Sequence, residues 1–185
     1  PALAHRLDRD TSGCLVLGRH RKALEDLFHL FRTGAVQKTY LAVVEGQPDA
    51  TDGLIDLALK KRDAKRGWWM KVAPDGQPAQ TQYRCLGTFE GRSLMALHPL
   101  TGRTHQLRVH MAAMGWPMMG DAVYGQAPRD QGPALHLHAA AITVPLYKNK
   151  PAITVHAPLP EPFRQTLHGL GLLDAAETIT TAAAG

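Results

Sequence analysis

The stretch His5-Arg6-Leu7-Asp8-Arg9-Asp10-Thr11-Ser12-Gly13 concentrates more reactive chemistry than any other part of the chain. It places one carboxylate, Asp8, between two arginines and ends in a predicted Thr-Ser-Gly turn. Because nearby positive charge favours the ionised form of a carboxyl group, we expect Asp8 to be charged at neutral pH. An ionised carboxylate suits a nucleophile or an electrostatic stabiliser better than a general acid. The alternative for so short a cluster is a surface loop whose charges compensate one another.

Length and composition are those of an ordinary globular chain. Its 185 residues suffice for one domain with a substantial core, and 44% are hydrophobic and 20% charged. The net charge of +5 and the pI near 9.4 favour a polyanionic partner. Cys14 and Cys85 lack CxxC spacing, so we expect reduced thiols in a cytoplasmic protein, without a disulfide or a metal site. No apolar run approaches the roughly 18 residues of a membrane span.

Hydrophobic periodicity and turn residues predict short strands with a few inserted helices. The helices are expected at 21–33, 105–114 and 162–170. The strands are expected at 15–18 (buried), 38–45, 54–59, 67–73, 79–87, 93–98, 134–144 and 151–156. Because strands and helices do not alternate regularly, the predicted fold class is α+β with a mixed, largely antiparallel central sheet. The Ala/Thr-rich residues 174–185 have little to bury and are expected to be disordered.

The segment Leu100–His110 (LTGRTHQLRVH) is the second cluster of reactive side chains. Its Thr-Gly pair predicts a turn, and Thr104 is the expected N-cap of the helix that follows. Arg108 lies four residues after Thr104 and therefore on the same helix face. Hydroxyl, imidazole and guanidinium groups at a helix start favour an anion site. We expect His105 and His110 to be hydrogen-bonded residues at the edge of the core and not metal ligands, because no third ligand stands at suitable spacing.

Four motifs in the same order resemble the RluA-type pseudouridine synthases, which modify uridines in large-subunit ribosomal RNA or transfer RNA. They are HRLDRDTSG at 5–13, KTY at 38–40, TGRTHQLRVHM at 101–111 and GDAVYG at 120–125. LHLHAAAITVPL at 135–146 is similar to the closing strand of that family. The resemblance implies a catalytic domain over residues 1–173 whose N-terminal portion precedes this sequence. It also implies flanking helices and loops that form an RNA-binding cleft.

The resemblance further implies a reaction and three catalytic residues. Isomerisation of uridine breaks the C1′–N1 bond, turns the base and forms a C1′–C5 bond, without a redox cofactor or any other cofactor. Asp8 matches the essential aspartate of the family and Arg108 the basic residue that pairs with it. Tyr40 matches a tyrosine that lies against the uracil ring and assists loss of the C5 proton; on its own it would be taken for a sheet residue. Whether Asp8 adds to C1′ or abstracts a sugar proton stays open.

RNA contacts are expected around these residues. Arg6 is the candidate to fill the space of a base turned out of its stack. Residues 60–71 contain six basic residues and two tryptophans. They predict either a clamp on the RNA backbone or a solvated hairpin, with at least one tryptophan in the core. Arg19, Arg21 and Lys22 form a second basic patch. The predicted RNA-binding residues are Arg6, Arg9, Arg19, Lys38, Lys61, Arg62, Lys65, Arg103 and His105.

The GDAVYG segment is expected to be a structural turn, with no catalytic role for Asp121. Asp8 and Asp10 form a DxD pair of the kind that can hold Mg²⁺, but we predict no metal because further carboxylates are lacking. The expected partner is ribosomal or transfer RNA, without an obligate protein partner, and the expected state is a monomer. Two alternatives stay open. One is a non-catalytic RNA-binding or ribosome-assembly module of the same fold, and the other is a metal-dependent phosphodiesterase or glycosyl-transfer enzyme.

Overall fold

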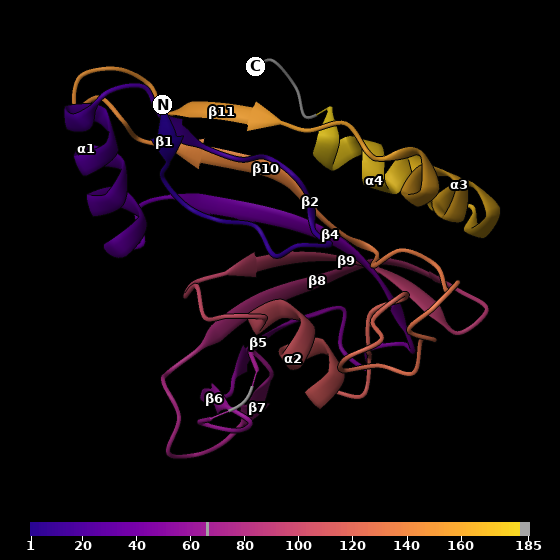
Figure 1. Ribbon diagram of the computed structural model, residues 1–185. Helices are drawn as coiled ribbons and strands as arrows, with labels where there is room; N and C mark the ends of the chain where they lie inside the picture. The colour runs from indigo at the N-terminus through magenta and orange to yellow at the C-terminus, as the bar shows by residue number, and fades with distance from the viewer. Residues whose placement is uncertain (66, 182–185) are drawn as a thin grey trace.

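A twisted central sheet with helices on both sides forms the body of the protein (Figure 1). The computed structural model describes residues 1–65 and 67–181. The described elements, in chain order, are β1 Ala2–Leu3, β2 Ser12–Gly13, β3 Leu17–Gly18, α1 Arg21–Arg32, β4 Gln37–Glu45, β5 Asp52–Asp56, β6 Leu59–Lys61, β7 Met70–Val72, β8 Gln80–Phe89, β9 Arg92–Pro99, α2 Gln106–Ala113, β10 Leu137–Val144, β11 Ile153–His156, α3 Glu161–Leu170 and α4 Leu173–Thr180.

The central sheet is mixed, as predicted. Its strands run in the order β11-β10-β4-β9-β8-β5, and each of these pairs is antiparallel. The short strand β2 joins β10 in parallel. Two small antiparallel sheets, β1–β3 and β6–β7, stand beside it. The predicted α+β class is confirmed, and the parallel element is the strand that follows Asp8 in the chain.

Strand β4 is buried on both faces because helices cover the sheet from opposite sides (Figure 1). Side chains alternate along a strand. Ala42 and Val44 pack with α2 residues in one core cluster, and Leu41 and Val43 pack with α3 and α4 residues in another. The continuous apolar run of β4 follows from this two-sided burial.

Helix α1 forms close to the predicted bounds. The His20 side chain accepts a hydrogen bond from the Ala23 amide at its start, and Gly34 follows its end with φ +73°. The strand predicted just before it is shorter than expected and is not buried. Leu15 and Leu17 are 44% and 47% exposed, because this segment pairs only with β1 in a small surface sheet.

The prediction that residues 174–185 are disordered is wrong for the described residues 174–181. Helix α4 occupies Leu173–Thr180, and Ala176 is buried against the same core cluster as Leu41. The Arg164 guanidinium of α3 binds the Glu177 carboxylate at 2.8 Å and ties the two helices together. Small residues were enough here because a neighbouring helix and the sheet supply the apolar contacts. Residues 182–185 of the predicted tail lie outside the described residues.

The β6–β7 hairpin contradicts the expectation that one tryptophan enters the core. Trp68 is 65% exposed and Trp69 37% exposed. Leu59 and Met70 fill the core instead, where they pack with Val109 of α2. The hairpin is therefore anchored by its aliphatic residues and presents its aromatic residues to solvent.

No helix in the described part of the chain is long and apolar enough to cross a membrane.

Candidate active site

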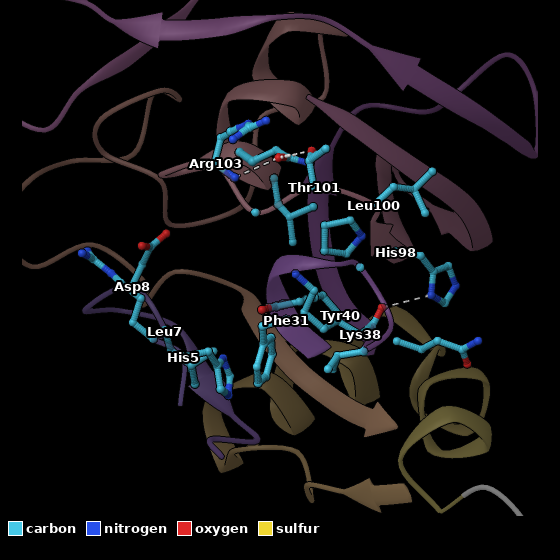
Figure 2. A pocket seen from close by; sticks show the side chains of 18 of the residues that line it. His5, Leu7, Asp8, Phe31, Lys38, Tyr40, His98, Leu100, Thr101 and Arg103 are labelled. Atoms are coloured by element: carbon cyan, nitrogen blue, oxygen red, sulfur yellow. Dashed lines mark hydrogen bonds between the residues drawn. The ribbon is translucent and has the colours of Figure 1, made fainter. Parts of the chain in front are cut away.

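A cavity of about 1160 Å³ opens beside β4 and is lined by all three predicted catalytic residues. Its walls come from the loop before β2, the C-terminal end of α1, the start of β4 and the loop between β9 and α2 (Figure 2). Asp8 is the single carboxylate among the lining residues. The basic residues that line the cavity with it are Arg6, Arg32, Lys38, Arg103 and Arg108. Such an excess of positive charge suits a polyanionic ligand.

The loop that carries Asp8 is fastened to β10 through Ser12 and Gly13. His138 Nε2 donates to the Ala157 carbonyl at 3.1 Å, so its Nδ1 accepts the Ser12 hydroxyl at 2.8 Å. Gly13 has φ +117°, and a Cβ there would overlap the Ala139 carbonyl oxygen. Ser12 and Gly13 are therefore an anchoring strand, and the expected turn lies earlier, where the Thr11 amide donates to the Asp8 carbonyl at 2.9 Å.

His5 fastens the other end of the loop to α1. Its ring stacks on Phe31 with centroids 4.6 Å apart, and its Nε2 accepts from the Val16 amide at 3.0 Å. Burial, with a smaller effect from the Lys38 charge, lowers the pKa of His5. A neutral His5 keeps its stacking contact with Phe31 and adds no charge to the cavity. Asp8 thus lies between two attachment points on different elements.

Asp8 is half-buried and faces the cavity. In Figure 2 its side chain lies across the open space from Leu100 and Thr101. Among residues 1–65 and 67–181, no basic group lies within 4.0 Å of its carboxylate in an ion pair. The expected direct pair between Asp8 and Arg108 is absent from that part of the chain, although both residues line the same cavity.

Arg108 binds Asp121 instead. Its Nε and Nη2 lie 3.0 and 2.7 Å from the two carboxylate oxygens, and both side chains are buried. Burial opposes ionisation of Asp121, but hydrogen bonds from Arg108 and the backbone amides of Tyr124 and Val123 outweigh it and hold the Asp121 pKa below its ordinary value. Asp121 is thus a charge partner of a cavity residue and more than the turn residue predicted, since the loop that follows α2 returns it to that helix.

Tyr124 supports Arg108 from the same loop. The Arg108 guanidinium carbon lies 5.2 Å from the Tyr124 ring centroid. The Tyr124 hydroxyl accepts from the Met70 amide at 3.0 Å and shares a second hydrogen bond of 2.7 Å with His105 Nδ1. The GDAVYG motif therefore supplies both the counter-charge and the aromatic support of Arg108.

Helix α2 starts one residue later than predicted. His105, not Thr104, is the N-cap residue, with φ +52° and no side-chain capping bond. Gln106 closes the preceding loop instead: its Oε1 accepts from the Thr101 hydroxyl at 2.7 Å and from the Arg103 amide at 3.1 Å. This closure brings residues 101–104 to the edge of the cavity, where the sequence predicted an anion site.

Tyr40 and Lys38 share one face of β4 and reach the cavity together. Burial, with a further contribution from the charge of Asp8, raises the pKa of Tyr40 to about 12. The phenol is therefore neutral at physiological pH and suits ring contact and hydrogen bonding better than proton abstraction while Asp8 is charged. Burial lowers the pKa of Lys38, whose ammonium lines the cavity without a carboxylate partner within 4.0 Å in the described part of the chain.

The two histidines of the second motif are hydrogen-bonded, as expected. His110 Nε2 donates to the Leu57 carbonyl at 2.9 Å and its Nδ1 accepts from Thr81 at 2.8 Å. His105 is bound to Tyr124 and does not line the cavity. Within the described ranges, no three His, Cys, Asp or Glu residues gather in a way that could hold a metal ion.

The remaining predicted RNA contacts divide into two groups. Arg6, Lys38 and Arg103 line the cavity, whereas the exposed Arg9, Arg19, Lys61, Arg62 and Lys65 lie outside it. Sequence reasoning missed the contribution of α1, whose last turn brings Phe31 and Arg32 to the cavity wall. Helical periodicity marks the apolar face of α1 but does not tell which end of the helix meets a site.

The sequence profile of the family described as RNA pseudouridylate synthase matches residues 1–113. The chain is 45% identical over 165 residues to an RNA pseudouridine synthase of Zymomonas mobilis, a match that covers 88% of this chain and 75% of that protein. It is 39% identical over 171 residues to ribosomal large subunit pseudouridine synthase C of Vibrio cholerae, covering 89% of this chain and 54% of the relative.

Solved structures of two human proteins have the same fold. Human RNA pseudouridylate synthase domain containing 4 superposes with a TM-score of 0.79 at 28% identity, over 92% of this chain and 76% of that one. Human RNA pseudouridylate synthase domain containing 1 gives 0.76 at 30% identity, over 95% and 72%. The profile match includes both the loop of Asp8 and the start of α2 with Arg108. With its α+β sheet and its cation-lined cavity around Asp8, the chain belongs to the RNA pseudouridylate synthase family, a family of uridine isomerases.

Proposed function

We propose that this chain converts specific uridines of ribosomal or transfer RNA to pseudouridine, with Asp8 as the group that reacts with the target nucleotide. The observation that carries the proposal is the cavity: one carboxylate without an ion-pair partner among the described residues, surrounded by five basic side chains. Residues 1–173 would form the catalytic domain. The proposal includes a monomer in the cytoplasm that needs no cofactor and no obligate protein partner.

The chemistry asks for a carboxylate that starts ionised and returns to that form. The C1′–N1 bond of uridine breaks, the base turns, C5 bonds to C1′, the C5 proton leaves and N1 gains a proton. Asp8 would either bond to C1′ or remove a sugar proton during these steps. In both routes its free oxygens must reach the sugar. A carboxylate already held in a bidentate pair by Arg108 would first have to give up those bonds, whereas Asp8 does not.

Tyr40 and Arg108 would act beside Asp8. We assign the neutral Tyr40 ring to contact with the uracil. Part of the elevation of the Tyr40 pKa comes from the Asp8 charge, so a bond between Asp8 and the sugar would make the phenol more acidic at that stage. Arg108, fixed by Asp121, would present its positive charge to the cavity without moving.

The outer cations would hold the RNA backbone. We assign phosphate contacts to Lys38 and Arg103 inside the cavity. The exposed residues assigned to the surrounding RNA are Arg9, Arg19, Lys61, Arg62 and Lys65, with His105 at the start of α2. Neutralising Lys61, Arg62 and Lys65 together should flatten the dependence of RNA affinity on salt by about 0.7 to 0.9 for each phosphate that the variant no longer binds. An unchanged slope would show that the hairpin does not hold the RNA backbone.

The test is a comparison of pseudouridine in total RNA from cells with the wild-type chain, with Asp8→Asn and without the protein. We expect specific pseudouridines with the wild type and their loss in the other two. The asparagine keeps the shape of Asp8 and removes its charge, so an unchanged thermal midpoint would show that the loss is chemical. Full conversion by Asp8→Asn would contradict the role of Asp8. The same pseudouridines in cells with the wild type and in cells without the protein would favour a non-catalytic RNA-binding module. Loss of activity in EDTA with intact RNA structure would favour the metal-dependent alternative.

A further inference from the structure

The tip of the β6–β7 hairpin presents two neighbouring tryptophans to solvent. Trp68 is 65% exposed and Trp69 37% exposed. Both follow β6 and precede Met70, the residue where β7 begins. Large aromatic side chains normally gain stability from burial. Two adjacent exposed tryptophans therefore indicate a surface that is covered by a ligand.

Cations from two separate segments surround these rings. The Lys61 ammonium lies 5.6 Å from the Trp68 ring centroid, and the Arg62 guanidinium lies 5.8 Å from that of Trp69. Arg129, from the loop between α2 and β10, lies 5.6 Å from the Trp69 ring. In the described ranges none of these three cations has a carboxylate within 4.0 Å. Their charges are thus available to an anionic ligand.

The two rings are not equivalent. Trp69 already has two guanidinium groups over its ring, so its role is to hold Arg62 and Arg129 in place. Trp68 has one ammonium beside it and the larger exposed fraction. Of the two, Trp68 is the ring with a surface free for stacking.

The base of the hairpin is packed into the core and contacts the residues that support Arg108. Leu59 and Met70 are buried against Val109 of α2. The Met70 amide donates to the Tyr124 hydroxyl at 3.0 Å, and the Tyr124 ring supports Arg108, which lines the cavity. A ligand on Trp68 would therefore lie next to the elements that carry Arg108.

We infer that Trp68 stacks on an unpaired base of the substrate RNA outside the cavity, while Lys61, Arg62 and Arg129 bind the phosphates on either side. This inference rests on the proposed function and adds a second contact site for the same RNA. An aromatic platform with cations around it suits single-stranded RNA, because the faces of paired and stacked bases are not available to it. The platform selects target uridines that have an unpaired neighbour.

Binding is tested with short single-stranded oligoadenylate and an equally short RNA duplex. Stacking on an indole quenches its fluorescence, and the chain has three tryptophans, so variants identify the ring. We expect oligoadenylate to quench the wild type and Trp69→Phe, but to quench Trp68→Phe much less, and the duplex to quench none of them. Persistent quenching in Trp68→Phe would overturn the inference.

Affinity gives the second measurement. Trp68→Ala should bind oligoadenylate roughly tenfold more weakly, within the range of one base–aromatic stack, and Trp68→Phe should recover most of the loss. Arg129→Ala should lower the salt slope by about 0.7, the value for one phosphate contact with a single strand. Phe89→Ala, which removes an exposed aromatic ring at the end of β8, is the matched control and should change neither quantity. Equal affinity of Trp68→Ala and wild type would contradict the inference.

Turnover separates this inference from the proposed function. If the wild type forms no pseudouridine in total RNA, the proposed function fails whatever the oligonucleotides show. If the wild type is active and Trp68→Ala modifies total RNA as fast at low enzyme concentration, the platform is not used and the inference alone fails. The expected result is a raised KM for RNA in Trp68→Ala with kcat retained.

Discussion

At the scale of single residues, the arrangement of Asp8, Arg108 and Asp121 decides how charge is distributed in the cavity. Arg108 has two hydrogen bonds to Asp121, so its positive charge is balanced before RNA arrives. No cation of residues 1–65 and 67–181 forms an ion pair with Asp8. The same separation makes Asp121 necessary for stability, because a buried guanidinium without its counter-charge is unfavourable.

Replacing Asp121 should therefore weaken both folding and activity. We expect Asp121→Asn to lower the free energy of unfolding by about 3 to 5 kcal/mol, the usual effect of breaking a buried pair. Urea denaturation measures this. Glu25→Gln is the control: it breaks the exposed Arg21–Glu25 pair and should change stability by less than about 0.5 kcal/mol. Similar losses in the two variants would show that the Arg108–Asp121 pair contributes no more than a surface pair.

Arg6 is expected to affect modification of folded RNA and not the stability of the protein. It is exposed and lines the cavity two residues before Asp8, where it can occupy the space that a turned-out base leaves. Arg6→Ala should slow modification of a uridine in folded RNA by at least about tenfold more than modification of the same uridine in a flexible strand. Single-turnover rates on both RNAs measure the difference, with Arg9→Ala as the control outside the cavity. Equal losses on the two RNAs would exclude this role for Arg6.

At the scale of elements, the pairing of β2 with β10 sets the position of the loop that carries Asp8. Gly13 combines φ +117° with a backbone approach to Ala139 that leaves no room for a Cβ. Gly34, after α1, also has a positive φ of +73°, but nothing lies within 4 Å of a Cβ there. A side chain at Gly13 would therefore meet both backbone strain and a steric clash, whereas a side chain at Gly34 would meet backbone strain alone.

Gly13→Ala should therefore destabilise the protein far more than Gly34→Ala. Gly34→Ala should lower the free energy of unfolding by about 1 kcal/mol, because alanine is strained in the left-handed backbone conformation. Gly13→Ala should lower the free energy of unfolding several times as much. It should also slow isomerisation, because the added methyl group forces β2 away from β10 and moves Asp8 with it. Thermal unfolding and turnover of both variants check this. Equal effects would mean that the β2–β10 contact does not position the loop.

Some of these elements can be predicted from the sequence and others cannot. Helix α1 and the β8–β9 hairpin could be predicted, because α1 has one apolar face and Glu90-Gly91 has the positive φ angles of a tight turn. Helix α4 could not, because its buried Ala176 and Thr180 have no apolar pattern of their own. The exposure of Trp69 could not be predicted either. An apolar side chain is expected in the core, but this ring lies beside Arg62 and Arg129, and Arg129 comes from a loop distant in sequence.

At the scale of the whole molecule, buried histidines couple stability to pH. His110, His136 and His138 are buried and hydrogen-bonded, and burial lowers the pKa of each below the ordinary value of 6.5. Above pH 6.5 these histidines are neutral in both the folded and the unfolded state and have no effect on stability. Below it the unfolded chain takes up protons that the folded protein excludes, so stability falls as the pH falls.

The urea midpoint should thus be lower at pH about 5.5 than at pH about 7.5. Each proton taken up only by the unfolded chain changes the unfolding free energy by about 1.4 kcal/mol per pH unit. His110→Gln should reduce the difference between the two pH values, whereas the exposed His168→Gln should leave it unchanged. A midpoint independent of pH would show that these imidazoles titrate alike in both states.

The cavity too could be predicted only in part. Asp8, Tyr40 and Arg108 line one cavity, as the resemblance to the pseudouridine synthases implies, although their catalytic roles remain proposals. The partner of Arg108 was assigned wrongly because it depends on the path of the loop after α2, which returns Asp121 to the helix from thirteen positions later. Sequence motifs identify which residues share a site, whereas the pairs within it depend on loop geometry.

The separation of Asp8 from Arg108 has a consequence for how a nucleotide is seated. An RNA strand that entered the cavity would meet one carboxylate, Asp8, and several cations, among them the ammonium of Lys38 and the guanidinium of Arg103. Its phosphates are driven towards those cations, which leaves the uncharged ribose as the part that can approach Asp8. We therefore expect the charges of the cavity to orient the nucleotide with its ribose towards Asp8 before any base is recognised.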